Sequence, residues 1–315
     1  IRILSPADYG VLSYVLSALA FFIPFAGGGM QYSFLRFAPM FANKQDRIGL
    51  FQHSLLCGGL LSFFLAIFML LLTPWFDDAV GDTSIYFRWL IIYLFGFFLI
   101  ELVKMRYRVA DQNKKYAEID ASLSALVLLL GIGLTYFYGP LAYIIVFVTV
   151  PFILGLVHLR ALKKVSIKIP KTYYSYGIWV GVGAIASQLM YSLDIFLVGN
   201  LIHDAEQVAI YRSASIIPLA LFFIPNSFLT THYTDLAKHS FDKTYLIGFA
   251  KDYLKLFSVL SFGVGGFLYF MSEFIIVTLF GELYTEAASL FQILVLGMLG
   301  AFILRIPFGN MLAAV

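Results

Sequence analysis

Charged residues are scarce in this sequence, and cysteine is almost absent. Asp, Glu, Lys and Arg make up 12% of the 315 residues, whereas hydrophobic residues make up 61% and the mean hydropathy is +0.89. Soluble globular domains carry about 25% charged residues, so a soluble fold is excluded. The single cysteine, Cys57, cannot form a disulfide within the chain.

Motifs of nucleotide-dependent and metal-dependent enzymes are also missing. There is no GxxxxGK[ST] stretch to cradle a phosphate, and the five histidines do not have the spacing of metal ligands. The polar loops are too short to hold a soluble catalytic domain. We therefore expect no cofactor, no metal site and no enzymatic activity, and the net charge of +3 does not indicate a nucleic-acid partner.

Apolar runs long enough to cross a membrane are what the sequence has in abundance. A spanning helix needs about 20 predominantly apolar residues, and runs of this kind recur along the chain. Because the runs are continuous and do not alternate with polar residues, they indicate helices and not barrel strands. The sequence thus predicts an all-α polytopic membrane protein with nine transmembrane helices, at about 9–31, 48–72, 85–105, 118–137, 141–160, 175–200, 207–229, 246–270 and 287–305.

Basic residues mark every second loop. Of the 21 Lys and Arg residues, 17 fall in 36–47, 104–115, 160–171 and 238–255, which the positive-inside rule places in the cytoplasm. The loops between them, such as 76–84 and 200–206, are acidic and are expected to face outward. Since the chain opens without Met and stops in apolar sequence, we also expect further helices on both sides.

An internal repeat with a period of six helices is suggested by two similar stretches. "ADYGVLSYVLSALAFFIP" at 7–24 and "AEQVAIYRSASIIPLALFFIP" at 205–225 both follow an acidic or polar loop and both reach Phe-Phe-Ile-Pro. An even period predicts two helical bundles of the same orientation. Pro24 with the glycines after it, and Pro218 with Pro225, are expected to kink the corresponding helix of each bundle.

Four stretches carry a family resemblance: "ILSPADYGVLSYVLS" followed by "LRFAP", then "LDIFLVGNLIHDAEQVAIYRSA", then "LFGELYTEAASLFQILVLG". Together they resemble the polysaccharide-exporter (Wzx-type) lipid-linked oligosaccharide flippases of the multidrug/oligosaccharidyl-lipid/polysaccharide superfamily. The resemblance implies two lobes of six helices around a cavity that opens alternately to each face. On this template 1–164 is the N-terminal lobe, without its first helix, and 165–315 is an incomplete C-terminal lobe.

The resemblance also implies a substrate, a location and partners. The family moves an undecaprenyl-diphosphate-linked oligosaccharide, the repeat unit of O-antigen, capsule or exopolysaccharide, across the bacterial cytoplasmic (inner) membrane. A polysaccharide polymerase and a chain-length regulator are the expected protein partners. Two other functions stay open: an ion-coupled multidrug exporter of the same superfamily, which would use a carboxylate in an apolar cavity, and a membrane-embedded polymerase or ligase, which should present a large outer loop.

Charges inside the membrane are the first candidates for a substrate site. Asp194 lies in the sixth predicted helix on one stripe with Ser187 and Tyr191, and exposing it to lipid would cost about 2.5 to 3.5 kcal/mol. Arg212, in the next helix, should lie at a similar depth and form an ion pair with Asp194. The pair is either a clamp between two helices or, with Arg88, part of a cavity that binds the diphosphate. Arg88 could instead snorkel to the interface.

Two further positions lie near the cytoplasmic ends of predicted helices. Arg36, in "SFLRFAPMF", matches an Arg-Phe signature typical of the family, but it could equally be an ordinary positive-inside anchor. Glu101 and Lys104 are three residues apart and are expected to pair on one helix face. Among the tyrosines, Tyr191 and Tyr14 are candidates for stacking on sugar rings.

Overall fold

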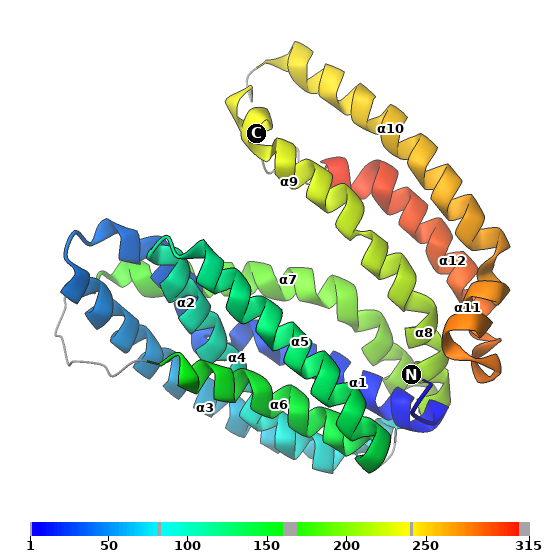
Figure 1. Ribbon diagram of the computed structural model, residues 1–315, viewed down its shortest axis with the longest axis horizontal. Helices are drawn as coiled ribbons and strands as arrows, with labels where there is room; N and C mark the ends of the chain where they lie inside the picture. Colours follow the sequence, from blue (N-terminus) through cyan, green and yellow to red (C-terminus); the bar gives the residue numbers. More distant parts are fainter. Residues whose placement is uncertain (1, 81–82, 160–168, 240–241, 309–315) are drawn as a thin grey trace. The chain divides into compact units, whose positions relative to one another are not determined.

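The computed structural model describes residues 2–80, 83–159, 169–239 and 242–308. All regular structure in these ranges is helical, which confirms the all-α prediction (Figure 1). The α-helices are α1 (Pro6–Phe22), α2 (Met30–Phe37), α3 (Lys44–Val80), α4 (Ser84–Val109), α5 (Asn113–Tyr138), α6 (Pro140–Val157), α7 (Lys171–Ile202), α8 (Ala205–Leu221), α9 (Phe223–Lys238), α10 (Lys243–Phe270), α11 (Ser272–Phe280) and α12 (Ala287–Gly300). Short irregular turns of helix lie between some of them: η1 (Ile23–Gly29), η2 (Ala38–Met40), η3 (Glu282–Tyr284) and η4 (Ala301–Arg305).

The described residues contain nine helical segments long and apolar enough to cross a membrane, as the sequence predicted. The first span, Pro6–Met40, is assembled from α1, η1 and α2, and the seventh, Ala205–Leu229, runs from α8 into α9. Several helices extend beyond their apolar runs, because amphipathic residues such as those at the start of α7 continue the helix outside the hydrocarbon region. The chain is therefore a multi-pass membrane protein.

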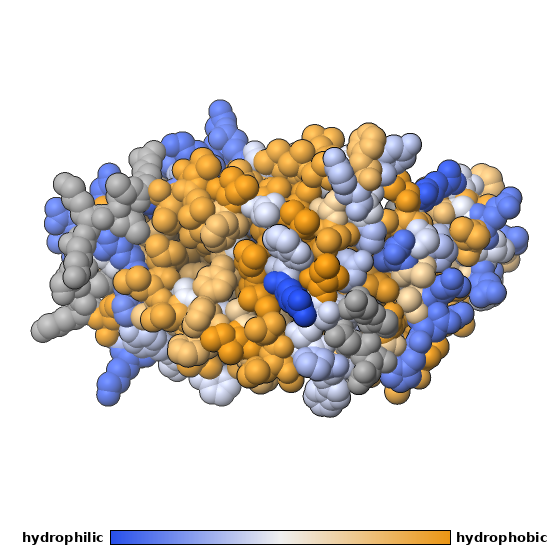
Figure 2. Space-filling view, turned by 90° about the horizontal axis from the view of Figure 1, so that it is seen from below, coloured by the Kyte–Doolittle hydropathy of each residue, from blue (hydrophilic) through white to orange (hydrophobic). Residues whose placement is uncertain are grey.

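The exterior has the character expected of a surface in contact with lipid. In Figure 2, hydrophobic residues cover most of the middle of the visible face, and hydrophilic residues lie mainly toward its ends. The exposed side chains include Leu60, Phe64 and Leu71 of α3 and Leu129 and Ile132 of α5. A surface of this kind is stable only where hydrocarbon replaces water.

The described helices form two compact units, and each is described by itself. The first unit is Ile3–Val208. Within it α4 is central: it packs against α3, α6, α2 and α5, and its side chains Leu94, Ile100 and Val103 are fully buried. α5 packs mainly on α6 and α4, whereas α7 packs on α1, η1, α2 and α3.

The second unit contains Arg2 and the chain from Ala209 onward. Its core is the packing of α10 on α12 and η4, where the Tyr253 hydroxyl donates a hydrogen bond of 3.0 Å to the Phe302 carbonyl. The Gln292 amide of α12 donates a hydrogen bond of 2.9 Å to the Ser272 hydroxyl of α11. Arg2 donates hydrogen bonds to the carbonyl oxygens of Val277 and Thr278, which lie in the last turn of α11.

The predicted lobe boundary, between 164 and 165, lies outside the described residues and stays a prediction. The compact units divide between Val208 and Ala209, and the packing of α7, the sixth span, on α1 and α2 accounts for its place in the first unit.

The two Phe-Phe-Ile-Pro stretches occupy equivalent places in their helices. α1 and α8 each contain 17 residues, α1 ends at Phe22 and α8 ends at Leu221, so both helices break at the repeated motif. In η1 the break is sharp, because Gly27, Gly28 and Gly29 all have positive φ angles of 56 to 75°. The predicted break after Pro24 is confirmed. In the seventh span the helix continues through Pro218 and ends at Leu221, just before the repeated motif.

Candidate functional site

The break in the first span sets the direction of α2. Gly27 has φ of +71° and donates its backbone N–H to the buried Ser62 hydroxyl at 2.9 Å. A Cβ at this position would lie 2.0 Å from the Phe98 ring, so the close approach of η1 to α3 and α4 requires glycine. The chain therefore leaves α1 and restarts as α2 at an angle fixed by packing.

α2 is held against the start of α7 by a small set of contacts. Gly29 and Gly177 approach so closely that a Cβ on Gly29 would lie 2.1 Å from the Gly177 carbonyl oxygen. The Ser33 hydroxyl donates to the Tyr173 carbonyl at 2.7 Å, and the buried Tyr173 hydroxyl meets the Ser54 hydroxyl at 2.5 Å. These buried bonds lock the register between two helices that are far apart in the sequence.

A pocket of about 530 Å³ opens between α2 and α7. We call it the Arg36 pocket, and its lining residues are Tyr32, Leu35, Arg36, Pro39, Met40, Tyr176 and Val180. It lies at the end of the first unit that carries the basic residues after α2 and after α4, which we call the basic end. The lining combines one cation and two tyrosines with apolar side chains, a composition typical of sites for amphipathic ligands.

Arg36 is the cation of this pocket and is exposed. No carboxylate among the residues that the structure describes lies within ion-pair distance of its guanidinium, so its charge is not neutralised by a described neighbour. A planar guanidinium with five N–H donors matches a phosphate oxygen pair bidentately. The pocket can therefore accept an anionic group beside aromatic and apolar surface.

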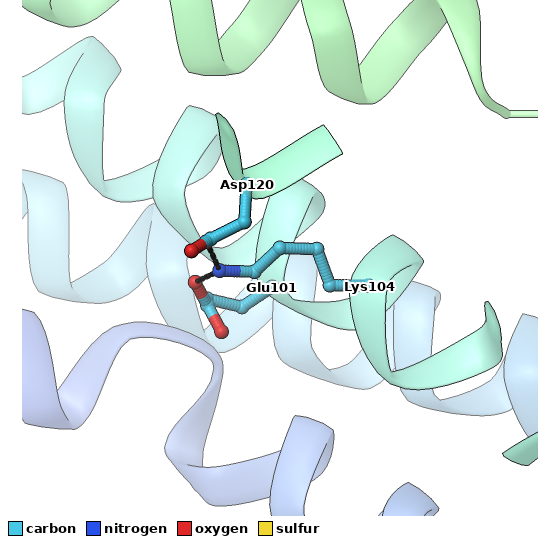
Figure 3. A network of polar contacts seen from close by, with 3 residues as sticks. All are labelled: Glu101, Lys104 and Asp120. Atoms are coloured by element: carbon cyan, nitrogen blue, oxygen red, sulfur yellow. Dashed lines mark hydrogen bonds and ion pairs between the residues drawn. The ribbon is translucent and has the colours of Figure 1, made fainter. Parts of the chain in front are cut away.

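A buried ion cluster lies on the α4 side of Tyr32. Figure 3 shows the Lys104 ammonium between two carboxylates, at 2.6 Å from Glu101 on the same helix and 2.7 Å from Asp120 on α5. The Lys104 side chain is 7% exposed, and Tyr32 lies within electrostatic reach of both Glu101 and Lys104. The predicted Glu101–Lys104 pair is confirmed, and Asp120 is a third member that sequence spacing could not reveal.

Comparison with known proteins assigns the chain to a family. A family model described as "Polysaccharide biosynthesis protein" matches residues 1–289, which is most of the chain and includes the Arg36 pocket. The chain belongs to this polysaccharide biosynthesis protein family. This confirms the resemblance carried by the sequence motifs. No curated protein and no solved structure gives a significant match.

The other predicted site residues of this polysaccharide biosynthesis protein are Arg88, Tyr191, Asp194 and Arg212. Arg88 is exposed in the second turn of α4, and Tyr191 and the half-buried Asp194 lie on α7, with Asp194 accepting a hydrogen bond from the Ile195 N–H at 2.8 Å. None of the three lines the Arg36 pocket. Arg212 lies in the second unit, so the ion pair between Asp194 and Arg212 stays a prediction.

Tyr32 and Tyr176 were not predicted as site residues from the sequence. Tyr32 precedes Arg36 by four residues, so the helical period could have placed both on one face of α2. Tyr176 is 140 residues away from Arg36, and only the packing of α7 on α2 brings it to the pocket. Tyr14, in contrast, is fully buried and its ring stacks on Phe196 at 5.7 Å, so it packs in the core.

Proposed function

We propose that the protein is a flippase that moves an undecaprenyl-diphosphate-linked oligosaccharide across the bacterial inner membrane by alternating access. Membership of a polysaccharide biosynthesis family supports the substrate class. The observation that carries the proposal is the Arg36 pocket: a guanidinium without a described carboxylate partner, two tyrosines and apolar side chains, in a space of about 530 Å³.

The chemistry of the pocket fits the polar head of such a lipid. Arg36 would bind the diphosphate through paired N–H donors, and its affinity is highest where water is excluded. Tyr32 and Tyr176 offer ring faces and hydroxyls to the first sugars, while Leu35 and Val180 give apolar contact to the start of the polyprenyl chain. The rest of the chain would stay in lipid, so only the head must cross.

The breaks in the first and seventh spans support a bundle that changes shape. Each break lies at the same Phe-Phe-Ile-Pro stretch, and each separates a 17-residue helix from the helix after it. Flexing at these two points would open one side of the cavity while closing the other. No bond is made or broken in this mechanism, so the proposed activity is transport and not catalysis.

The partners follow from the substrate. The protein would receive the lipid-linked oligosaccharide on the cytoplasmic side and deliver it to a polymerase and its chain-length regulator on the periplasmic side. Arg36 would then lie on the loading side, where the positive-inside rule places the basic end.

The test uses the complete protein in proteoliposomes with a fluorescent undecaprenyl-diphosphate oligosaccharide, and the transbilayer rate is followed with a membrane-impermeant quencher. The wild type should exceed empty liposomes, Arg36→Ala should lower the rate at least tenfold, and Arg36→Lys should recover only part of it, since an ammonium cannot bind bidentately. Lys44→Ala is the matched control: Lys44 is an exposed basic residue near Arg36 that does not line the pocket.

Three results would reject the proposal or part of it. No rate above empty liposomes, together with export of an organic cation under an ion gradient, would favour the multidrug exporter. Formation of longer glycans from the same lipid would favour the polymerase. Equal loss in Arg36→Ala and Lys44→Ala would reduce Arg36 to a positive-inside anchor.

A further inference from the structure

A second pocket lies at the basic end of the first unit, where α4 and α6 end and α5 begins. Its volume is about 300 Å³, and we call it the Lys115 pocket. Its lining residues are Tyr107, Lys115, Glu118, Ile119, Ser122, Leu154 and His158. Its lining residues come from α4, α5 and the end of α6, whereas those of the Arg36 pocket come from α2, η2 and α7, so the two pockets are separate.

Aromatic contacts hold the cation of this pocket in place. The Lys115 ammonium lies 5.8 Å from the centroid of the Tyr107 ring, a cation–π contact. The Tyr107 ring in turn meets the His158 ring edge to face at 6.1 Å. The His158 Nδ1 donates to the Leu154 carbonyl at 2.9 Å, since a carbonyl can only accept, and this bond fixes the imidazole in the wall of the pocket.

The pocket is lined by one cation, Lys115, and one carboxylate, and the carboxylate has a second basic residue beside it. Glu118 is its one acidic lining residue, and the carboxylate of Glu118 lies 3.9 Å from the ammonium of the neighbouring Lys114. Lys115 is therefore not the partner of Glu118. Arg108 adds a further cation nearby, because its guanidinium lies 5.9 Å from the ring of Tyr116 on the first turn of α5.

Below the pocket, an apolar stripe continues along α5 into the membrane. Lys115, Ile119 and Ser122 are spaced by four and three residues and so share one face of the helix. The same face continues with Leu126, Leu129 and Leu130, which are 37%, 69% and 44% exposed. α5 is thus a lipid-facing helix with a cationic pocket at one end of an exposed leucine stripe.

We propose that the Lys115 pocket binds the phosphate headgroup of an anionic phospholipid whose acyl chains lie along the leucine stripe of α5. Basic pockets between transmembrane helices at the basic, cytoplasmic side are suited to anionic headgroups. The volume is at the lower end of the range for ligand pockets, which fits a headgroup better than an oligosaccharide. The Ser122 hydroxyl lies between the charged and apolar parts, where it can donate to a phosphate or ester oxygen.

The test places the complete protein in phosphatidylcholine nanodiscs and titrates it with fluorescent phosphatidylglycerol. Lys115→Gln removes the charge at nearly constant size and should weaken binding about fivefold, the effect of one basic residue at an anionic surface. Ser122→Phe should also weaken binding, because the ring fills the pocket while leaving every charge in place. Lys44→Gln is the matched control, since Lys44 is an exposed basic residue that does not line the pocket; the affinity of this variant should change less than twofold.

The outcomes separate a pocket from diffuse attraction. Equal loss in Lys44→Gln and Lys115→Gln, with no effect of Ser122→Phe, would show that the basic surface alone attracts the lipid and would overturn the proposal. A separate titration with inorganic phosphate distinguishes the ligand source. If phosphate alone binds as tightly as phosphatidylglycerol, the acyl chains contribute nothing and the phospholipid assignment is wrong. Both readouts are independent of transport activity.

Discussion

The Ser33 hydroxyl of α2 donates a hydrogen bond of 2.7 Å to the Tyr173 carbonyl of α7, and both residues are fully buried. This bond joins two helices whose residues are 140 positions apart in the chain. It lies next to the contact of Gly29 with Gly177 and places Tyr176 opposite Arg36. The geometry of the Arg36 pocket therefore depends on how closely α2 approaches α7.

The first prediction concerns that close approach. A Cβ on Gly177 would lie 2.6 Å from the Ser33 hydroxyl oxygen and 3.0 Å from the Gly29 carbonyl oxygen. Gly177→Ala should therefore push α2 away and lower the free energy of unfolding by about 1 to 3 kcal/mol, the usual cost of overpacking. The measurement is thermal unfolding of the purified protein in detergent.

Gly183→Ala is the control on the same helix. Nothing lies within 4 Å of a Cβ built on Gly183, so alanine should leave the unfolding temperature unchanged or raise it slightly through its helix propensity. Equal effects of the two substitutions would show that the α2–α7 approach is not tightly packed.

The buried ion cluster gives a second prediction. Lys104→Met leaves Glu101 and Asp120 without their shared cation, and Glu101 is only 20% exposed. The expected loss is about 2 to 3 kcal/mol of unfolding free energy, below the full cost of breaking a buried pair because Asp120 is half exposed. Unfolding in detergent would measure it.

Lys114→Met serves as the comparison for the cluster. The Lys114 ammonium lies 3.9 Å from Glu118 with both side chains exposed, so its removal should have no measurable effect on stability. If both lysine variants were equally stable, the cluster would contribute no more than a surface pair.

A third prediction concerns the hydrogen bond that holds the break in the first span. Ser62 is fully buried and its hydroxyl accepts the Gly27 N–H at 2.9 Å. Ser62→Ala would leave that N–H buried and unsatisfied, at a cost of about 1 to 3 kcal/mol. The exposed Ser289, whose hydroxyl donates to the Glu286 carbonyl at the N-cap of α12, is the control: Ser289→Ala should unfold at the wild-type temperature. A Ser62→Ala protein as stable as wild type would mean that another group satisfies Gly27.

The Asp194–Arg212 ion pair is the fourth prediction and is tested by a double-mutant cycle. If the two side chains pair, Asp194→Ala and Arg212→Ala should each destabilise the protein, and the double variant should lose at least about 1 kcal/mol less than the sum. The cycle is run on unfolding free energy, and the same four proteins are assayed for transport. Additive losses would show that the two charges do not interact.

The transmembrane spans could be predicted from the sequence because each span depends on local composition. Runs such as 48–72 and 287–305 are apolar for the full thickness of a bilayer, and no folding partner is needed to make them helical there. The break after Phe22 was also readable, since proline and consecutive glycines interrupt a helix wherever they occur. The pairing of Glu101 with Lys104 follows from helical spacing alone.

The two pockets could not be predicted from the sequence, because each is formed by helices whose contact no sequence pattern indicates. The sequence indicated Arg36 as a candidate site residue. The pocket around Arg36 also requires Tyr176, which reaches it because two glycines let α7 approach η1 and α2. Lys115 and His158 share a pocket because α5 and α6 pack together, although 43 positions separate them in the chain.

By itself, then, the sequence determined that this chain is a helical membrane protein, with nine spans in the described residues and with basic and acidic loops in alternation, since hydropathy and helical period act over one helix at a time. Only the tertiary structure decided which charges meet aromatic rings, which carboxylates share Lys104 and which glycines are contact points. Those choices depend on side-chain packing between helices, where a difference of an ångström decides whether two backbones touch, and that distance is not encoded in any single segment.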